Sequence, residues 1–115
     1  MKFSVPIKVP SKSNSYRIHR AGSRQWIAPS DEVVAAERAI ALFARTHLPD
    51  FTGPVTVTIG IHGRIDIDNC AKVLLDGLQL SGRIANDSQV EELHIKRYPG
   101  KNEVVHIEVT ANDPL

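Results

Sequence analysis

The stretch that most constrains the fold is residues 55–62, Val-Thr-Val-Thr-Ile-Gly-Ile-His, in which apolar residues alternate with polar or small ones. Alternation with a period of two is typical of a strand that has one face in the core. The chain leaves this strand through Gly63, passes two acids, Asp66 and Asp68, and enters a segment with helical spacing. The sequence therefore predicts a strand that ends at an acidic turn and continues as a helix.

Helical periodicity predicts two main helices. The first spans about Asp31 to His47, with Ser30 as a capping residue before it and Pro49 shortly after it. The second spans about Asp68 to Leu80 and is closed by Ser81-Gly82. In the second helix Cys70 is expected to pack inward, because a lone cysteine can form neither an internal disulfide nor a structural zinc site.

Further strands are expected on both sides of these helices. They are residues 3–9, a hairpin of 16–20 and 24–28, and a second hairpin of 91–99 and 103–110. Alternation in the second hairpin predicts core positions at Leu93, Ile95, Val105, Ile107 and Val109. The order of elements predicts an α+β fold, with a mixed or mainly antiparallel sheet and two main helices packed on it.

Length and composition predict one domain over residues 1–115, because 115 residues with 42% hydrophobic and 23% charged content suit a single core. No apolar run approaches the length of a membrane span. The first six residues lack the apolar stretch of a secretory signal. We therefore expect a cytoplasmic protein that makes no use of a membrane.

Basic residues gather at the front of the chain. Residues 1–30 hold six lysines and arginines and no aspartate or glutamate, interleaved with Tyr16, His19 and Trp26. Positive charge beside aromatic rings is typical of a surface that binds nucleic-acid phosphates and bases. The candidate DNA-binding residues in this segment are Lys12, Asn14, Arg17, Arg20 and Arg24. The alternative is a solvated basic hairpin with no partner.

The acidic run offers a candidate metal site. In extended backbone Asp66 and Asp68 would point the same way, with Ile65 and Ile67 toward the core, so that one cation could touch both carboxylates. Lys72 follows Asp68 by one helical turn. A third carboxylate, Asp87, lies in the turn-like segment 86–90, and such a set of acids suits a hard divalent cation.

Other interpretations of the run stay open. Asp68 could serve only as a helix cap, with Asp66 solvated and Lys72 an ordinary surface cation. A helix-loop-helix calcium site is excluded, because it requires Gly at its sixth position and Glu at its twelfth. Counted from Asp66, these positions are Ala71 and Gly77.

The run Asp66-Ile67-Asp68-Asn69-x-x-Lys72, with Asp76 after it and Asn86-Asp87-Ser88-Gln89-Val90 further on, resembles the RusA family of Holliday junction resolvases. Pro10-Ser11-x-x-Asn14 and the long central helix extend the resemblance over almost the whole chain, although its specific part is residues 66–90. Asn86 departs from the family pattern, which often has an aspartate there. The resemblance implies a Mg²⁺-dependent endonuclease that acts as a homodimer and nicks two opposing strands of four-way junction DNA.

By the same resemblance Asp66, Asp68 and Asp87 look like the metal-binding catalytic aspartates, and Lys72 looks like the catalytic lysine. Hydrolysis of a phosphodiester requires an activated water and stabilisation of negative charge, which fits this set. Ser88 has no neighbouring histidine in the sequence to support a covalent mechanism. The alternative function is a non-catalytic nucleic-acid-binding module that uses only the basic N-terminal surface.

Overall fold

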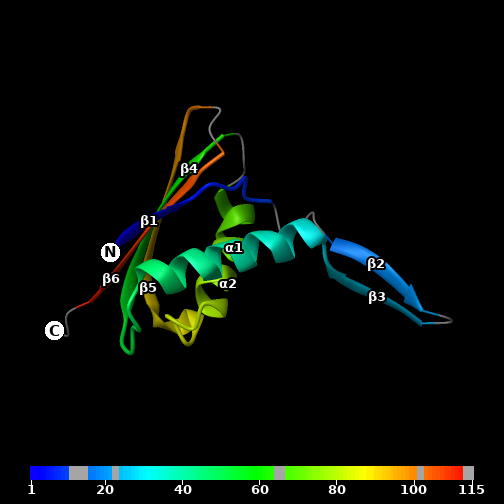
Figure 1. Ribbon diagram of the computed structural model, residues 1–115, viewed down its shortest axis with the longest axis horizontal. Helices are drawn as coiled ribbons and strands as arrows, with labels where there is room; N and C mark the ends of the chain where they lie inside the picture. Colours follow the sequence, from blue (N-terminus) through cyan, green and yellow to red (C-terminus); the bar gives the residue numbers. More distant parts are fainter. Residues whose placement is uncertain (11–15, 22–23, 64–66, 101–102, 113–115) are drawn as a thin grey trace.

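The computed structural model describes residues 1–10, 16–21, 24–63, 67–100 and 103–112. Helices and strands follow one another along the chain in an α+β order (Figure 1). They are β1 (Lys2–Val5), β2 (Tyr16–Ala21), β3 (Arg24–Pro29), α1 (Asp31–His47), β4 (Val55–His62), α2 (Ile67–Leu80), the 3₁₀-helix η1 (Asp87–Gln89), β5 (Val90–Tyr98) and β6 (Val105–Ala111).

The main sheet has four strands in the order β1-β6-β4-β5. Strand β6 pairs antiparallel with both β1 and β4, whereas β5 pairs parallel with β4. Both helices lie on one side of this sheet, and none of the described elements covers its other face (Figure 1). The α+β class, the mixed sheet and the two packed helices are therefore confirmed.

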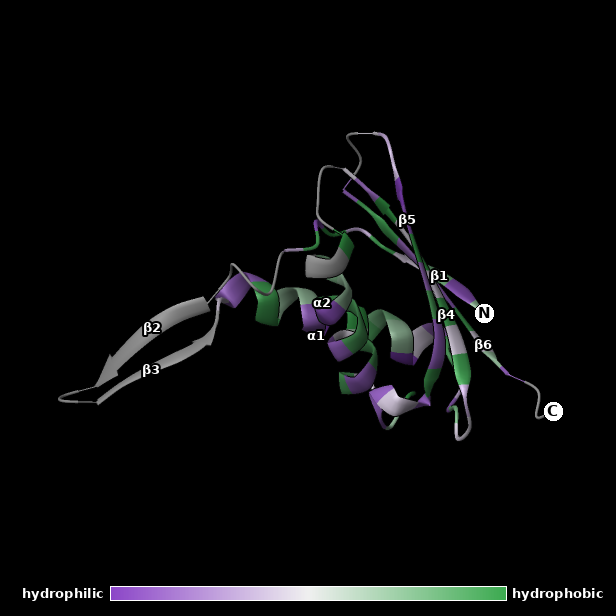
Figure 2. Ribbon diagram, turned by 180° about the vertical axis from the view of Figure 1, so that it is seen from behind, coloured by the Kyte–Doolittle hydropathy of each residue, from purple (hydrophilic) through white to green (hydrophobic). Residues whose placement is uncertain are grey.

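The predicted second hairpin is wrong, because β5 and β6 lie on opposite sides of β4 and do not pair with each other. The turn-like residues at 100–102 favour a hairpin, but a parallel pair can be joined only through a crossover, and α2 provides one between β4 and β5. Strand β6 then lies at the other edge of β4. The prediction that Leu93 lies in the core is also wrong, because this residue is 37% exposed on the edge strand β5. Hydrophilic residues dominate this strand (Figure 2).

Strand β1 is shorter than predicted and ends at Val5. Pro6, which follows it, has no N–H to donate to a ladder. The Ile7 N–H instead donates to the Val5 carbonyl at 2.9 Å. Val9 is nevertheless buried, with 4% of its surface exposed, so the alternation continues beyond the strand.

The first hairpin, β2–β3, is confirmed, with pairing from Tyr16 opposite Pro29 to Ala21 opposite Arg24. It forms a two-stranded sheet of its own. We call it the hairpin arm, because it projects from the start of α1 away from the main sheet (Figures 1 and 2). With this arm the molecule measures 54 Å along its longest axis and 33 and 24 Å along the others.

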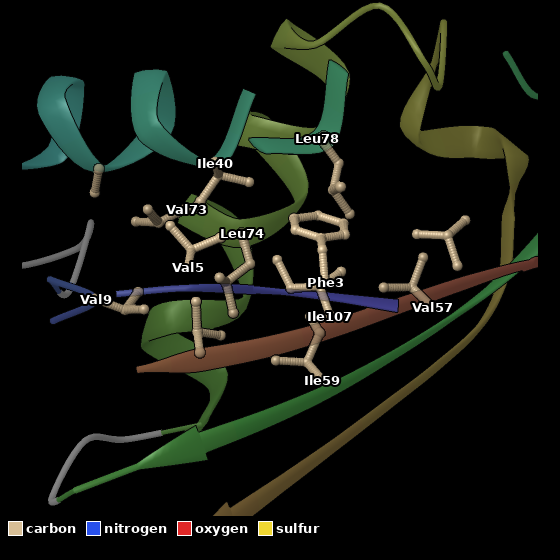
Figure 3. Packing of buried hydrophobic residues seen from close by; sticks show 14 of the residues in the cluster. Phe3, Val5, Val9, Ile40, Val57, Ile59, Val73, Leu74, Leu78 and Ile107 are labelled. Carbon is tan, nitrogen blue, oxygen red and sulfur yellow. The ribbon is translucent and has the colours of Figure 1, made fainter. Parts of the chain in front are cut away.

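The core lies between the sheet and the two helices. Figure 3 shows side chains of β1, β4 and β6 meeting those of α1 and α2. Cys70 is fully buried in this cluster, as predicted. The helices themselves approach closely at Gly77, where an added Cβ would lie 2.8 Å from Ile40 Cβ, so a larger residue would force them apart. Within the part of the chain that the structure describes, neither helix has the length and apolar character needed to cross a bilayer.

Candidate active site

The acidic run begins where β4 ends. Gly63 follows the strand with a φ of 112°, a left-handed conformation that glycine adopts without strain. Asp66 falls in 64–66, outside the described residues. Helix α2 begins at Ile67, so Asp68 lies in its first turn rather than at its capping position, where it was expected.

This early helix start corrects a second expectation. Because Ile67 and Asp68 are already helical, the alternation of an extended strand does not orient Asp68. Ile67 is 37% exposed, and its predicted place in the core is wrong.

Lys72 lies one turn beyond Asp68 on α2 and is exposed. The neighbouring residues Cys70, Val73 and Leu74 are all buried, which turns Lys72 toward solvent. Lys72 can therefore approach a bound anion from the solvent side of α2.

Asp87 is exposed at the first position of η1. The Asn86 side chain caps this short helix by accepting from the Ser88 N–H at 3.0 Å. Asparagine performs this role as well as aspartate does. The departure of position 86 from the family pattern therefore leaves the local structure intact.

Gln89 fixes the segment that carries Asp87. Its Oε1 accepts from the backbone N–H of Ala85 at 2.8 Å and of Asn86 at 3.2 Å. Its Nε2 donates to the carbonyls of Phe51 and Gly53, both at 2.9 Å. One side chain thus ties η1 to the loop before β4. Sequence reasoning gave Gln89 no role of its own, although its place in the quoted motif was a signal.

A second set of bonds fixes the segment between α2 and η1. Arg83 donates to the Asp50 carboxylate at 2.9 Å and to the Arg45 carbonyl at 2.9 Å. The Phe51 N–H donates to the Arg83 carbonyl at 2.8 Å. Asp87 is therefore presented by a segment that is braced on both sides.

Within one chain Asp87 lies far from the start of α2. Strands β4 and β5 are parallel and pair from Val55 opposite Val90 to His62 opposite Tyr98, with one irregularity between Val55 and Thr56. The segment before β5 therefore lies at the end of the sheet where β4 begins. Asp68 lies at the other end, beyond His62. At about 3.3 Å per residue this strand spans about 23 Å. The yellow segment before β5 and the green start of α2 lie at opposite ends in Figure 1.

The family model described as "Endodeoxyribonuclease RusA" matches residues 6–110. The chain belongs to the RusA family. The matched range contains the acidic run, α2 and η1, and the resemblance noted in the sequence is thereby confirmed. A search of the curated proteins gives no match.

The donor set of this RusA-family chain consists of carboxylates, the oxygen ligands that Mg²⁺ prefers. Among the described side chains, no three acids, histidines or cysteines are grouped to hold a metal ion. Asp66 and the side chain of Asp68 lie outside the described part of the structure. The set fits Mg²⁺ chemically, but Asp87 and Asp68 of the same chain are too far apart to share one ion.

The candidate DNA-binding residues fall in two places. Lys12 and Asn14 lie in 11–15, outside the described residues. The backbone of Arg17, Arg20 and Arg24 lies on the hairpin arm, with Arg20 opposite Gln25 and Arg24 opposite Ala21. The basic segment is thus separate from the core of this RusA-family protein, on the part that projects farthest from it.

Proposed function

We propose that this protein is a Mg²⁺-dependent, structure-selective endodeoxyribonuclease that resolves four-way DNA junctions by paired hydrolysis, in DNA recombination and repair in the cytoplasm. The observation that carries the proposal is the family match over residues 6–110, which includes every candidate catalytic residue. An α+β body with an exposed Asp87 on a braced segment supports it.

The proposed chemistry assigns a role to each side chain. Asp66, Asp68 and Asp87 would hold Mg²⁺ through carboxylate oxygens. When bound, the metal supplies an activated water and stabilises charge on the phosphate. Lys72, exposed on α2, places a positive charge beside a phosphoryl oxygen and stabilises negative charge that develops there.

The separation of the acids supports a homodimer. A single site built from all three would take Asp66 and Asp68 from one protomer and Asp87 of the partner subunit. Two-fold symmetry would then produce two equivalent sites. Two equivalent sites match two equivalent strands at a junction, so the dimer explains paired nicking as well as metal binding.

The proposed DNA-binding surface is the basic front of the chain. Arginines on the arm would pair with phosphates away from the metal, where the acids do not repel DNA. The projection of the arm along the longest axis of the molecule supports this assignment (Figure 1). The proposed surface includes Lys12 and Asn14, which precede the arm in sequence.

The proposal is tested with a labelled four-way junction, cut in the presence of Mg²⁺ or of EDTA. We expect cleavage only with Mg²⁺. Asp66→Asn, Asp68→Asn and Asp87→Asn should each lower the rate by about a thousandfold, because loss of a ligand charge removes several kcal/mol of stabilisation.

Junction binding should persist in these three variants, which separates the nuclease from a module that only binds. Glu32→Gln is the matched control, since Glu32 is an exposed acid outside the proposed site. It should cut normally. Near wild-type cleavage by any one aspartate variant would remove that residue from the site, and cleavage in EDTA would reject the metal.

A further inference from the structure

Three rings form a row on the open face of the sheet, on the side away from the helices. Tyr98 of β5 stacks on His62 of β4, with ring centroids 5.6 Å apart and planes at 29°. His62 in turn meets His106 of β6 edge-on, at 5.4 Å. We call these three residues the ring row. It crosses three adjacent strands near the end of the sheet where β4 finishes.

The ring row is held in place by its neighbours. Gly60 leaves room for the Tyr98 ring, since an added Cβ there would lie 3.0 Å from that ring. The hydroxyl of Ser4 on β1 hydrogen bonds with His106 Nδ1 at 2.7 Å. Rings fixed in this way form a surface before any ligand arrives, which lowers the entropy lost on binding.

Charged side chains surround the ring row on this face of the sheet. Lys96 lies over the Tyr98 ring, 5.0 Å from its centroid, and makes no ion pair with any other described residue. Two carboxylates belong to this face. Glu92 lies toward the other end, within 4 Å of His94. Glu108 lies two residues from His106 on β6 and within 4 Å of Lys2. Around the ring row, Lys96 and Lys2 therefore outnumber the one described strand carboxylate, Glu108, which pairs with Lys2 at 3.8 Å.

We propose that the ring row with Lys96 is a stacking site for an unpaired nucleotide of the DNA, an inference that rests on the proposed function. A four-stranded sheet with helices on one face and rings on the other is a recurrent way to stack bases of single strands. Aromatic rings bind any base through its flat face, and Lys96 would pair with the adjoining phosphate. Half-exposed Tyr98, at 39%, leaves its ring accessible.

The position of the site relates it to cleavage. The Gly63 N–H donates to the Tyr98 carbonyl at 3.4 Å, and the chain continues from Gly63 directly into the acidic run. A base held on the ring row would thus lie beside the strand presented to the candidate catalytic residues. Bases that are already unpaired or distorted cost least to extract from the stack. The site would favour branched DNA over an intact duplex.

The test measures DNA binding in EDTA, so that it does not depend on catalysis. The probes are a labelled oligothymidylate of ten nucleotides and a fully paired duplex. Tyr98→Leu removes the ring and keeps an apolar side chain, and Tyr98→Phe keeps the ring. Thr110→Ala is the control on the same face at the far end of the sheet. Thermal melting and sedimentation are recorded for each variant.

We expect Tyr98→Leu to weaken oligothymidylate binding by about tenfold, with a much smaller loss for duplex, because one base–ring stack is removed. Tyr98→Phe and Thr110→Ala should bind as wild type. Lys96→Gln should make the plot of log affinity against log salt shallower by roughly 0.7 for the single strand.

Three results would overturn the proposal: no loss in Tyr98→Leu, equal losses for single strand and duplex, or dissociation of a dimer, which would make this face a contact between copies. If junction cleavage fails but these differences hold, the nuclease proposal alone is wrong. If cleavage occurs and the differences are missing, the stacking site alone is wrong.

Discussion

The two ends of the main sheet differ in how they present acidic side chains. Where β4 begins, Asp87 is carried by a segment that Gln89 and Arg83 fasten to the rest of the fold. Where β4 finishes, the chain passes through Gly63 into the first turn of α2, which contains Asp68. Under the proposed function, each end would supply part of the donor set that one cation requires. The proposal thus treats the molecule as two half-sites joined by the main sheet.

Mixed dimers test this division most strongly. An Asp68→Asn protomer paired with an Asp87→Asn protomer places both defects in one shared site and leaves the other site intact. Mixing two inactive variants should then restore about a quarter of the wild-type sites, since about half of the dimers are mixed and each has one working site. Nicking of one strand, rather than paired cleavage, is the product to measure.

If all the acids of a site came from one chain, every site in the mixture would contain a defect, and no activity would return. Mixing Asp66→Asn with Asp68→Asn is the matched control, because those residues belong to the same half-site. That mixture should stay inactive. Activity in the control with none in the test mixture would reverse the assignment.

Gln89→Leu tests the braced half-site by itself. The change removes four hydrogen bonds and leaves the carbonyls of Phe51 and Gly53 without that partner. We expect the free energy of unfolding to fall by about 2 kcal/mol. Cleavage of the folded variant should fall by about tenfold, because small displacements of a ligand are costly to catalysis. Urea unfolding and single-turnover kinetics measure the two effects.

Gln79→Leu serves as the comparison variant, since Gln79 is exposed on α2 and lies outside this network. Its stability and cleavage should match wild type. If Gln89→Leu loses stability but cuts normally once folded, the brace supports the fold and does not position Asp87.

The smallest expected effect concerns the hairpin arm, which belongs to neither end of the sheet. Replacing Arg17, Arg20 and Arg24 with alanine should make the dependence of log affinity on log salt shallower by roughly 0.9 for each phosphate that the arm no longer neutralises. Asp68→Asn should bind DNA in EDTA as tightly as wild type or somewhat more tightly, because a negative charge is removed. An unchanged salt slope in the arginine variant would relocate the DNA-binding surface.

Local pattern was sufficient to place the strongest elements. The predicted bounds of α1 and β4 agree with the structure at both ends, because their periodicity is regular and Ser30 caps the helix. Strand order was not predictable in the same way. The sequence of residues 99–104 is compatible both with a turn between paired strands and with a connection to a strand that is not adjacent. Which of the two forms depends on the edge of β4 against which β5 pairs after α2.

For the same reason, the sequence predicts which residues form the candidate site but not how they are arranged in space. A motif identifies the acids by type and spacing, and the family match covers all of them. Neither the motif nor the family match indicates that Asp87 and Asp68 lie at opposite ends of the parallel pair β4 and β5. Two of the four hydrogen bonds of Gln89 likewise join residues 36 and 38 apart in sequence. Such contacts exist only once the fold has formed.

The pairing of β1 with β6 has a consequence for biosynthesis. Lys2 lies opposite Glu108, and Val5 opposite Val105, so the first strand of the sheet finds its partner only when the last has been made. During translation β1 must wait, with Phe3 and Val5 exposed, while the rest of the chain emerges. Contacts of such long sequence separation slow folding. Completion of this sheet is therefore expected only after β6 has emerged from the ribosome.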